Sequence, residues 1–261
     1  MTNHPLSNVT MIDLSVVTGE NYPAHWPTSP MFHTYRYVWY DDFRGAAYSR
    51  FLSIEEHHGT HFDAPAHIIP PQGSGFADAT DGEWITTEKV PLTQFIGPAA
   101  VIDCRTLIGQ AEPGYSPLIT RQHLENWEAR YGQIEASDCV LFYTGWTDLH
   151  YKPFPEGNNL AFNPGILKNM AAWPAPDVGA MELLVERGVR LVGTDGVAMG
   201  PCEDDHPPHV VGLKANMIFI EKLTNLAQLP PRGAAFPFLP LRIENGSGAP
   251  GRAVAFLPTQ N

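Results

Sequence analysis

The stretch His57-His58-Gly59-Thr60-His61-Phe62-Asp63-Ala64-Pro65-Ala66-His67 carries four of the chain's eleven histidines and one carboxylate. Neutral imidazole and carboxylate are the ligands that hold a first-row divalent ion without thiolate. A catalytic ion needs about three protein ligands and an open position for water. This stretch therefore supplies enough ligands for a catalytic metal site.

The spacing of these residues predicts how the chain must run. The three odd-numbered histidines and Asp63 would face one way on an extended chain, whereas His58 would face the other way. On a straight strand, however, His57 and His61 would lie roughly 13 Å apart at about 3.3 Å per residue, too far to share an ion. We therefore expect a strand that bends at Gly59 and enters a loop. A helix is disfavoured because glycine, threonine and proline are poor helix formers.

The complete pattern His-x-Gly-Thr-His-x-Asp-x-Pro-x-His over residues 57–67 resembles the signature of the cyclase family of metal-dependent hydrolases. That family includes the isatin hydrolases and the bacterial kynurenine formamidases. The resemblance implies that His57, His61 and Asp63 are metal ligands and that His67 is the catalytic acid/base. A lone His-x3-His pair would be a weak signal, but the whole pattern is specific.

A second element of the family is a His and a Glu twelve residues apart, and it matches His209 and Glu221. The resemblance implies that both are metal ligands. If Asp63 bridges to a second ion held with them, the site is binuclear, so we expect one or two ions per subunit. The lack of cysteine ligands favours zinc or manganese without choosing between them.

Two further histidines are not assigned as ligands. His58 falls on the wrong parity, and His206 lies in the acidic, proline-rich run Glu203-Asp204-Asp205-His206-Pro207-Pro208, which we interpret as a loop. Asp195 follows a predicted strand in Gly-Thr-Asp-Gly and is a secondary candidate, because an Asp in a tight turn is as often a local hydrogen-bonding residue.

The resemblance leaves the substrate open between two types. The segments Val101–Cys104, Trp127–Gly132 and Pro240–Gly248 resemble the isatin hydrolases, and this similarity covers most of the chain. Glu221, however, is the formamidase-type ligand, whereas isatin hydrolases lack a carboxylate there and use a single manganese ion. We therefore expect an amidohydrolase that cleaves the C–N bond of a small aromatic or cyclic amide, isatin-type or N-formylkynurenine-type, by metal-activated hydroxide.

Two alternatives remain open. A lactone hydrolase would use the same hydroxide on an ester carbonyl, and a non-catalytic binding protein would use the metal as a structural element. A closed structural site fills all four coordination positions and needs no unligated acid/base. The role of His67 therefore discriminates between a catalytic and a structural metal.

Composition excludes several other classes. The formal net charge of −12, from 16 basic and 28 acidic residues, argues against a nucleic-acid partner. With 43% hydrophobic and 17% charged residues the chain is typical of a globular protein, and no stretch approaches a membrane span. The widely spaced Cys104, Cys139 and Cys202 indicate reduced thiols. The N-terminal Met-Thr-Asn-His-Pro-Leu shows no secretory signal, so we expect a cytoplasmic enzyme.

Alternating strand and helix patterns predict a single α/β domain over residues 1–261. Strands are expected at 10–18, 97–104, 138–144, 189–193, 217–220 and 252–257. Helices are expected from the cap at Thr120 to Gly132 and from Pro176-Asp177 to Gly188. The family resemblance implies a mixed sheet that curls into a barrel-like core of the swivelling β/β/α type. Neither a phosphate-binding glycine loop nor a Gly-x-Ser-x-Gly elbow is present, which disfavours nucleotide chemistry and serine hydrolysis.

Residues 20–51 form an aromatic-rich segment that we assign to substrate binding or subunit contact. Ten of the 28 aromatic residues fall between Tyr22 and Phe51, although packing in a core would explain most of them. Trp26 is the substrate-binding candidate, because its Trp-Pro-x-x-Pro context resembles a family segment beside the substrate. The resemblance also implies a homodimer or homotetramer, in which this segment reaches a neighbouring subunit.

Overall fold

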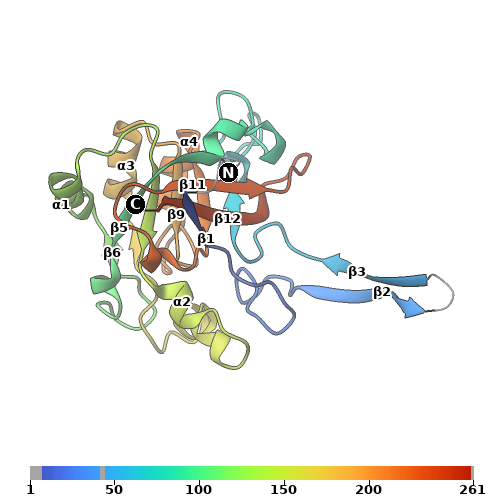
Figure 1. Ribbon diagram of the computed structural model, residues 1–261. Helices are drawn as coiled ribbons and strands as arrows, with labels where there is room; N and C mark the ends of the chain where they lie inside the picture. Colours follow the sequence, from blue (N-terminus) through green and yellow to red (C-terminus); the bar gives the residue numbers. More distant parts are fainter. Residues whose placement is uncertain (1–7, 42–44, 260–261) are drawn as a thin grey trace.

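Seven strands close into a barrel in the computed structural model, which describes residues 8–41 and 45–259 (Figure 1). Around the barrel the strands are β12 (Gly248–Pro258), β11 (Ala235–Pro240), β5 (Ile96–Asp103), β7 (Cys139–Tyr143), β9 (Leu191–Thr194), β10 (Ile218–Glu221) and β4 (His61–Asp63). Strand β4 pairs again with β12, and β1 (Val9–Asp13) adds to β12. Pairs β5–β7, β7–β9 and β9–β10 are parallel and the other neighbours antiparallel. The predicted mixed, barrel-like α/β fold is confirmed.

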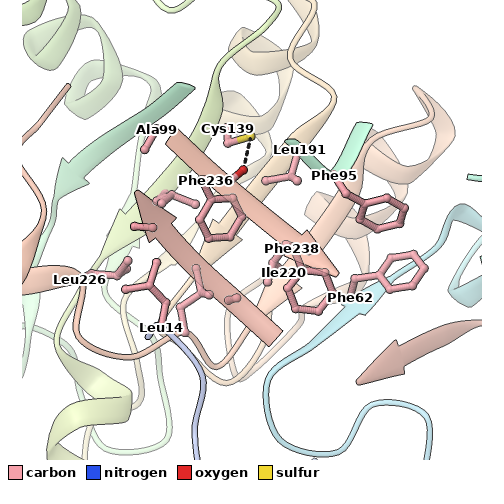
Figure 2. Packing of buried hydrophobic residues seen from close by; sticks show 14 of the residues in the cluster. Leu14, Phe62, Phe95, Ala99, Cys139, Leu191, Ile220, Leu226, Phe236 and Phe238 are labelled. Carbon is pink, nitrogen blue, oxygen red and sulfur yellow. Dashed lines mark hydrogen bonds between the residues drawn. The ribbon is translucent and has the colours of Figure 1, made fainter. Parts of the chain in front are cut away.

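On the parallel strands, odd-numbered and even-numbered side chains are both apolar. Both faces of these strands are therefore buried. On β5, Ala99 and Val101 join the cluster inside the barrel, whereas Ala100 and Ile102 join the cluster on its outer face. Figure 2 shows Phe236, Phe238 and other rings and aliphatic chains packed in the interior. The barrel interior is therefore a solid core, and the site must lie at its edge.

Three helices cover the outer face of the parallel strands: α1 (Arg121–Tyr131), α3 (Val178–Glu186) and α4 (His206–Lys214). Helix α1 begins after Thr120, which forms a capping box with His123, and ends at Gly132. Helix α3 begins after Asp177, whose carboxylate accepts a hydrogen bond of 2.7 Å from the backbone N–H of Ala180. Both predicted helices are confirmed, because their capping signals are local.

Short elements connect these layers. They are α2 (Trp146–His150), the two-stranded pair β6 (Leu118–Ile119) and β8 (Ala175–Pro176), the one-turn helices η1 (Pro65–His67), η2 (Thr87–Lys89), η3 (Leu92–Phe95), η4 (Arg105–Leu107), η5 (Glu156–Asn159) and η7 (Leu226–Gln228), and the π-helical η6 (Phe162–Ile166). The described residues include no helix that is long and apolar enough to cross a membrane.

Two expectations from the sequence are wrong in detail. The first strand ends at Asp13 rather than near residue 18, because the Asp13 carboxylate accepts a hydrogen bond from the backbone N–H of Ser15 and turns the chain. The run that we interpreted as a loop up to Pro208 contains the start of α4 at His206. Pro207 and Pro208 fit there, since the first turn of a helix needs no backbone N–H donors.

The aromatic-rich segment forms a long hairpin, β2 (His33–Asp41) and β3 (Gly45–Ser53), that projects from the barrel (Figure 1). Exposed rings line it, including Tyr35 (58% exposed) and Phe51 (65% exposed). Residues 42–44 of this segment, and the N-terminal residues 1–7 on which the expectation of no secretory signal rests, lie outside the described residues. All three cysteines are free, as expected, with Cys104 and Cys139 buried in the core.

Candidate active site

Strand register brings the two sequence motifs together. Strand β4 lies between β10 and β12, and its residue His61 pairs directly with Glu221 on β10. Directly paired residues of antiparallel strands project to the same face, so these two side chains meet. Asp63 lies two residues further along β4, on the same side, and pairs with Gly248 of β12. His67 follows in η1.

Gly59 makes the bend that places His57 beside the strand. Its φ of +67° lies in the left-handed region, and a Cβ there would come within 2.9 Å of the Thr18 hydroxyl. Only glycine satisfies both conditions without strain. The bend that we expected at Gly59 is therefore confirmed, but the expected strand before it is wrong, because His57 lies in a turn and strand β4 begins only at His61.

The predicted ligands form one buried cluster. Nε2 of His57 lies 3.5 Å and Nε2 of His61 lies 3.4 Å from Oδ1 of Asp63. Nε2 of His61 is also 3.4 Å from Oε2 of Glu221, and Nε2 of His209 is 3.6 Å from Oε1 of the same carboxylate. All five side chains are at most 5% exposed.

The second nitrogen of each candidate histidine ligand already has a partner. Nδ1 lies 2.8 Å from Oε1 of Glu55 in His57, 2.9 Å from the carbonyl oxygen of Gly59 in His61, and 2.7 Å from the carbonyl oxygen of Asp205 in His209. Each of these acceptors holds a proton on Nδ1, so Nε2 is the nitrogen that faces the cluster and can bind an ion. Such outer contacts are typical of histidines that bind metal.

Unpaired buried atoms show that the cluster fits a cation. Nε2 of His57, Nε2 of His61 and Oδ1 of Asp63 are buried and have no hydrogen-bond partner within the described ranges 8–41 and 45–259. Buried polar atoms without a partner are rare and often mark an ion. Two ligand groups, His57–Asp63–His67 and Asp63–His209–Glu221, each bring their ligand atoms within 4.8 Å of one another, and they share Asp63.

Charge balance in the metal-free cluster is set by the two carboxylates. Burial lowers the pKa of His209, but the nearby carboxylate of Glu221 outweighs this effect and raises the pKa to about 9. Burial opposes ionisation of Glu221, yet the neighbouring imidazoles of His209 and His61 hold its pKa well below the usual range. Without an ion, protons on imidazole rings therefore compensate the carboxylates.

His67 lies at the edge of the cluster. Its ring centroid is 4.1 Å from that of His57, and the side chain is half-buried. Burial lowers the pKa of His67 to about 4, although the charge of Asp63 opposes the shift. The ring is therefore neutral at pH 7 and can accept a proton, and its position also allows it to contact an ion held by His57 and Asp63.

The residues that we left out of the ligand set lie apart from the candidate metal groups. His58 is buried and stacks on Phe32, with ring centroids 5.6 Å apart. His206 is exposed at the start of α4. The secondary candidate Asp195 accepts hydrogen bonds from the backbone N–H groups of Thr144 (2.7 Å) and Gly145 (2.6 Å), so it ties the ends of β7 and β9 together.

Sequence reasoning missed His25. Its ring centroid lies 5.1 Å from that of His61 and 5.5 Å from that of His57, and its Nδ1 is 2.9 Å from Nζ of the buried Lys222. The one available signal in the sequence was that His25 directly precedes Trp26, the predicted substrate-binding residue. Without knowledge of the chain path, an isolated histidine gave no reason to connect it to residues 57–67.

Trp26 directly follows His25 in the sequence but packs elsewhere. The half-buried indole meets Trp173 edge-on, with centroids 6.2 Å apart. A Cβ on Gly165 would come within 2.7 Å of the indole, so Gly165 leaves room for it. The substrate-binding role of Trp26 stays a prediction.

Comparisons with known proteins show the family of this chain. The family model "Cyclase", described as "Putative cyclase", matches residues 12–201. The chain is 30% identical to isatin hydrolase of Roseibium aggregatum over 96% of this chain and 92% of that protein. It is 30% identical to kynurenine formamidase of Salinibacter ruber over 78% of this chain and 77% of that protein.

A solved structure is similar over the same extent. Isatin hydrolase A from Ralstonia solanacearum superposes with a TM-score of 0.81 at 31% identity, covering 96% of this chain and 92% of that chain. The chain therefore belongs to the cyclase family of metal-dependent hydrolases.

Proposed function

We propose that this enzyme hydrolyses the C–N bond of a small cyclic or aromatic amide. The observation that carries the proposal is the set of unpaired, buried atoms on His57, His61 and Asp63, which face one another beside a neutral His67. The names of the relatives, isatin hydrolase and kynurenine formamidase, support a cyclic or aryl amide as the substrate class.

A bound divalent ion would supply Lewis acidity, which lowers the pKa of a coordinated water and polarises a carbonyl. His57, His61 and Asp63 would hold it. His67 would accept a proton from the attacking water and return it to the leaving nitrogen. The water oxygen bonds to the carbonyl carbon, the C–N bond breaks, and the products are a carboxylic acid and an amine.

We further propose that two ions can bind. The two ligand groups share Asp63, and carboxylates commonly bridge ions in binuclear hydrolases. Zinc and manganese both suit a set of imidazole and carboxylate ligands. Metal analysis of the chelator-stripped protein after reloading with each ion would measure the stoichiometry; saturation at one ion per subunit would contradict the second site.

The substrate can be identified by a direct comparison. Chelator-stripped protein is reloaded with zinc or manganese and is assayed on isatin and on N-formylkynurenine. Metal-dependent turnover of isatin would establish a cyclic amide, and turnover of N-formylkynurenine an open-chain one. The similarity to isatin hydrolase over 96% of the chain leads us to expect isatin-type turnover. Metal-independent turnover would contradict the mechanism.

A lactone hydrolase is the second candidate, because the same site would attack an ester carbonyl. Metal binding without turnover of either amide, together with turnover of a lactone, would favour it. A non-catalytic metal-binding protein would turn over none of these compounds.

We also propose that the β2–β3 hairpin contacts a second copy of the chain in a homodimer or homotetramer. An isolated two-stranded hairpin is marginally stable in water, and this one exposes Tyr35, Trp39, Tyr48 and Phe51. Trp26 stays the proposed substrate-binding residue, as its Trp-Pro-x-x-Pro context implies. A protein that sediments as a monomer and is fully active would contradict this role of the hairpin.

A further inference from the structure

Lys222 is a lysine with no exposed surface, located directly after the candidate ligand Glu221. Its backbone has a left-handed φ of 54°, and both its N–H and its carbonyl oxygen form hydrogen bonds. The Lys222 N–H donates to the carbonyl oxygen of Gly196 (3.2 Å), and the Thr60 hydroxyl donates to the Lys222 carbonyl oxygen (2.8 Å). Burying an ammonium group is costly unless it is hydrogen-bonded, so the partners of the Lys222 Nζ matter.

The Lys222 ammonium has two hydrogen-bond partners among the described residues. Nζ lies 2.9 Å from Nδ1 of His25 and 3.3 Å from the carbonyl oxygen of Val197. An ammonium group has only donors, so Nδ1 of His25 accepts this bond. The ring proton of a neutral His25 is therefore held on Nε2.

This arrangement places the His25 ring beside the candidate metal centre. A ring nitrogen of His25 lies within 4.8 Å of ligand atoms of both His61 and Glu221. At that distance His25 could also be a metal ligand. The Lys222 ammonium, however, contacts the same ring and repels a cation. The pairing with Lys222 instead suits a ring that donates a hydrogen bond to negative charge.

We propose that His25 is a catalytic residue whose Nε2–H donates a hydrogen bond to the substrate carbonyl oxygen as that oxygen gains negative charge. Lys222 is a positioning residue that fixes the tautomer of His25. The inference rests on the proposed amide hydrolysis. His25 donates a hydrogen bond and transfers no proton; the proton of the attacking water still moves through His67. Donors aimed at a developing oxyanion typically contribute about 10²–10³ in kcat.

The tautomer can be measured without any turnover. Nitrogen-15 NMR of the zinc-loaded protein, labelled at histidine, should show the His25 proton on Nε2 in the wild type. In Lys222→Met, which keeps the length of the side chain but removes the donor, the Nδ1–H form should appear. A wild-type proton on Nδ1, or an unchanged tautomer in Lys222→Met, would overturn the positioning role.

Kinetics and zinc content then test the contact with substrate. In His25→Ala we expect about a 10²-fold loss of kcat on isatin, a KM within about threefold of wild type, and unchanged zinc content. His25→Gln should recover part of kcat, because its amide N–H₂ can replace the Nε2–H donor. His206→Ala is the matched control, since His206 is exposed on α4, and it should behave like wild type.

Three outcomes are decisive. Loss of zinc in His25→Ala would make His25 a metal ligand and overturn the proposal, as would an unchanged kcat. No hydrolysis of isatin, N-formylkynurenine or a lactone by the wild-type enzyme would instead refute the proposed function. The NMR and zinc measurements separate the two failures, because they report on His25 and Lys222 in the absence of catalysis.

Discussion

Gly248 leaves the space that the His57 ring occupies, so Gly248→Ala should displace a candidate metal ligand. A Cβ at this position would lie 2.5 Å from Nε2 of His57, 2.8 Å from its Cδ2 and 2.6 Å from the carbonyl oxygen of Phe62. Ordinary contacts are about 3.5 Å, so the overlap is about 1 Å. The Phe62 backbone is held between β12 and β10, and the imidazole is therefore the group that must move.

The expected cost follows from the precision that metal sites require. Ligand distances tolerate about 0.2 Å, so a shift of about 1 Å removes His57 from the ligand set. We expect Gly248→Ala to weaken zinc binding at least about 10²-fold and to destabilise the metal-free protein by about 1–3 kcal/mol through overpacking.

The assay is zinc competition against a chelating dye, together with thermal unfolding of the metal-free protein. Gly82→Ala is the control, because the nearest atom to a Cβ there is the Thr80 hydroxyl oxygen at 3.8 Å. A folded Gly248→Ala protein with wild-type zinc affinity would refute the reasoning and remove His57 from the metal site.

Three further predictions concern the same region. His67→Ala should lower kcat by about 10²–10⁴ and retain the bound metal, whereas metal loss measured by elemental analysis would make His67 a ligand. Zinc affinity should rise with pH, by about tenfold per unit for each proton displaced, up to about pH 9, because the ion must replace the proton that Glu221 holds on His209. Calorimetry in two buffers of different ionisation enthalpy would detect this proton release, and its absence would contradict the assignment of His209. Asp195→Asn should destabilise the fold by about 1–3 kcal/mol and leave zinc content unchanged, because its amide N–H₂ would face the backbone N–H of Gly145. Zinc loss at wild-type thermal stability would instead place Asp195 in the site.

The sign of the pH effect on stability follows from the same pKa. The folded-state pKa of His209 is about 9, above its usual value of 6.5. The pairing with Glu221 therefore stabilises the metal-free protein fully below pH 6.5, and this contribution is lost as the pH rises through 9. Zinc removes the dependence by replacing the proton.

Local signals in the sequence determined much of the fold. The caps at Thr120 and Asp177 predicted the starts of α1 and α3, because a cap depends on residues only a few positions away. The same local reasoning missed α4, since Pro207 and Pro208 suggest a loop until their place in a first helical turn is known. The bend at Gly59 followed from the distance that the ligands of residues 57–67 had to cover.

Only the tertiary structure decided how the distant segments meet. His61 lies opposite Glu221 because β4 inserts between β10 and β12, and that register depends on burial of the whole barrel rather than on either motif. His25 and Lys222 are 197 residues apart, so no local pattern could pair them. The sequence thus determined which side chains could bind a metal, because ligand chemistry belongs to single residues; the closed sheet determined which of them share one buried site, because packing acts between segments that are remote in the chain.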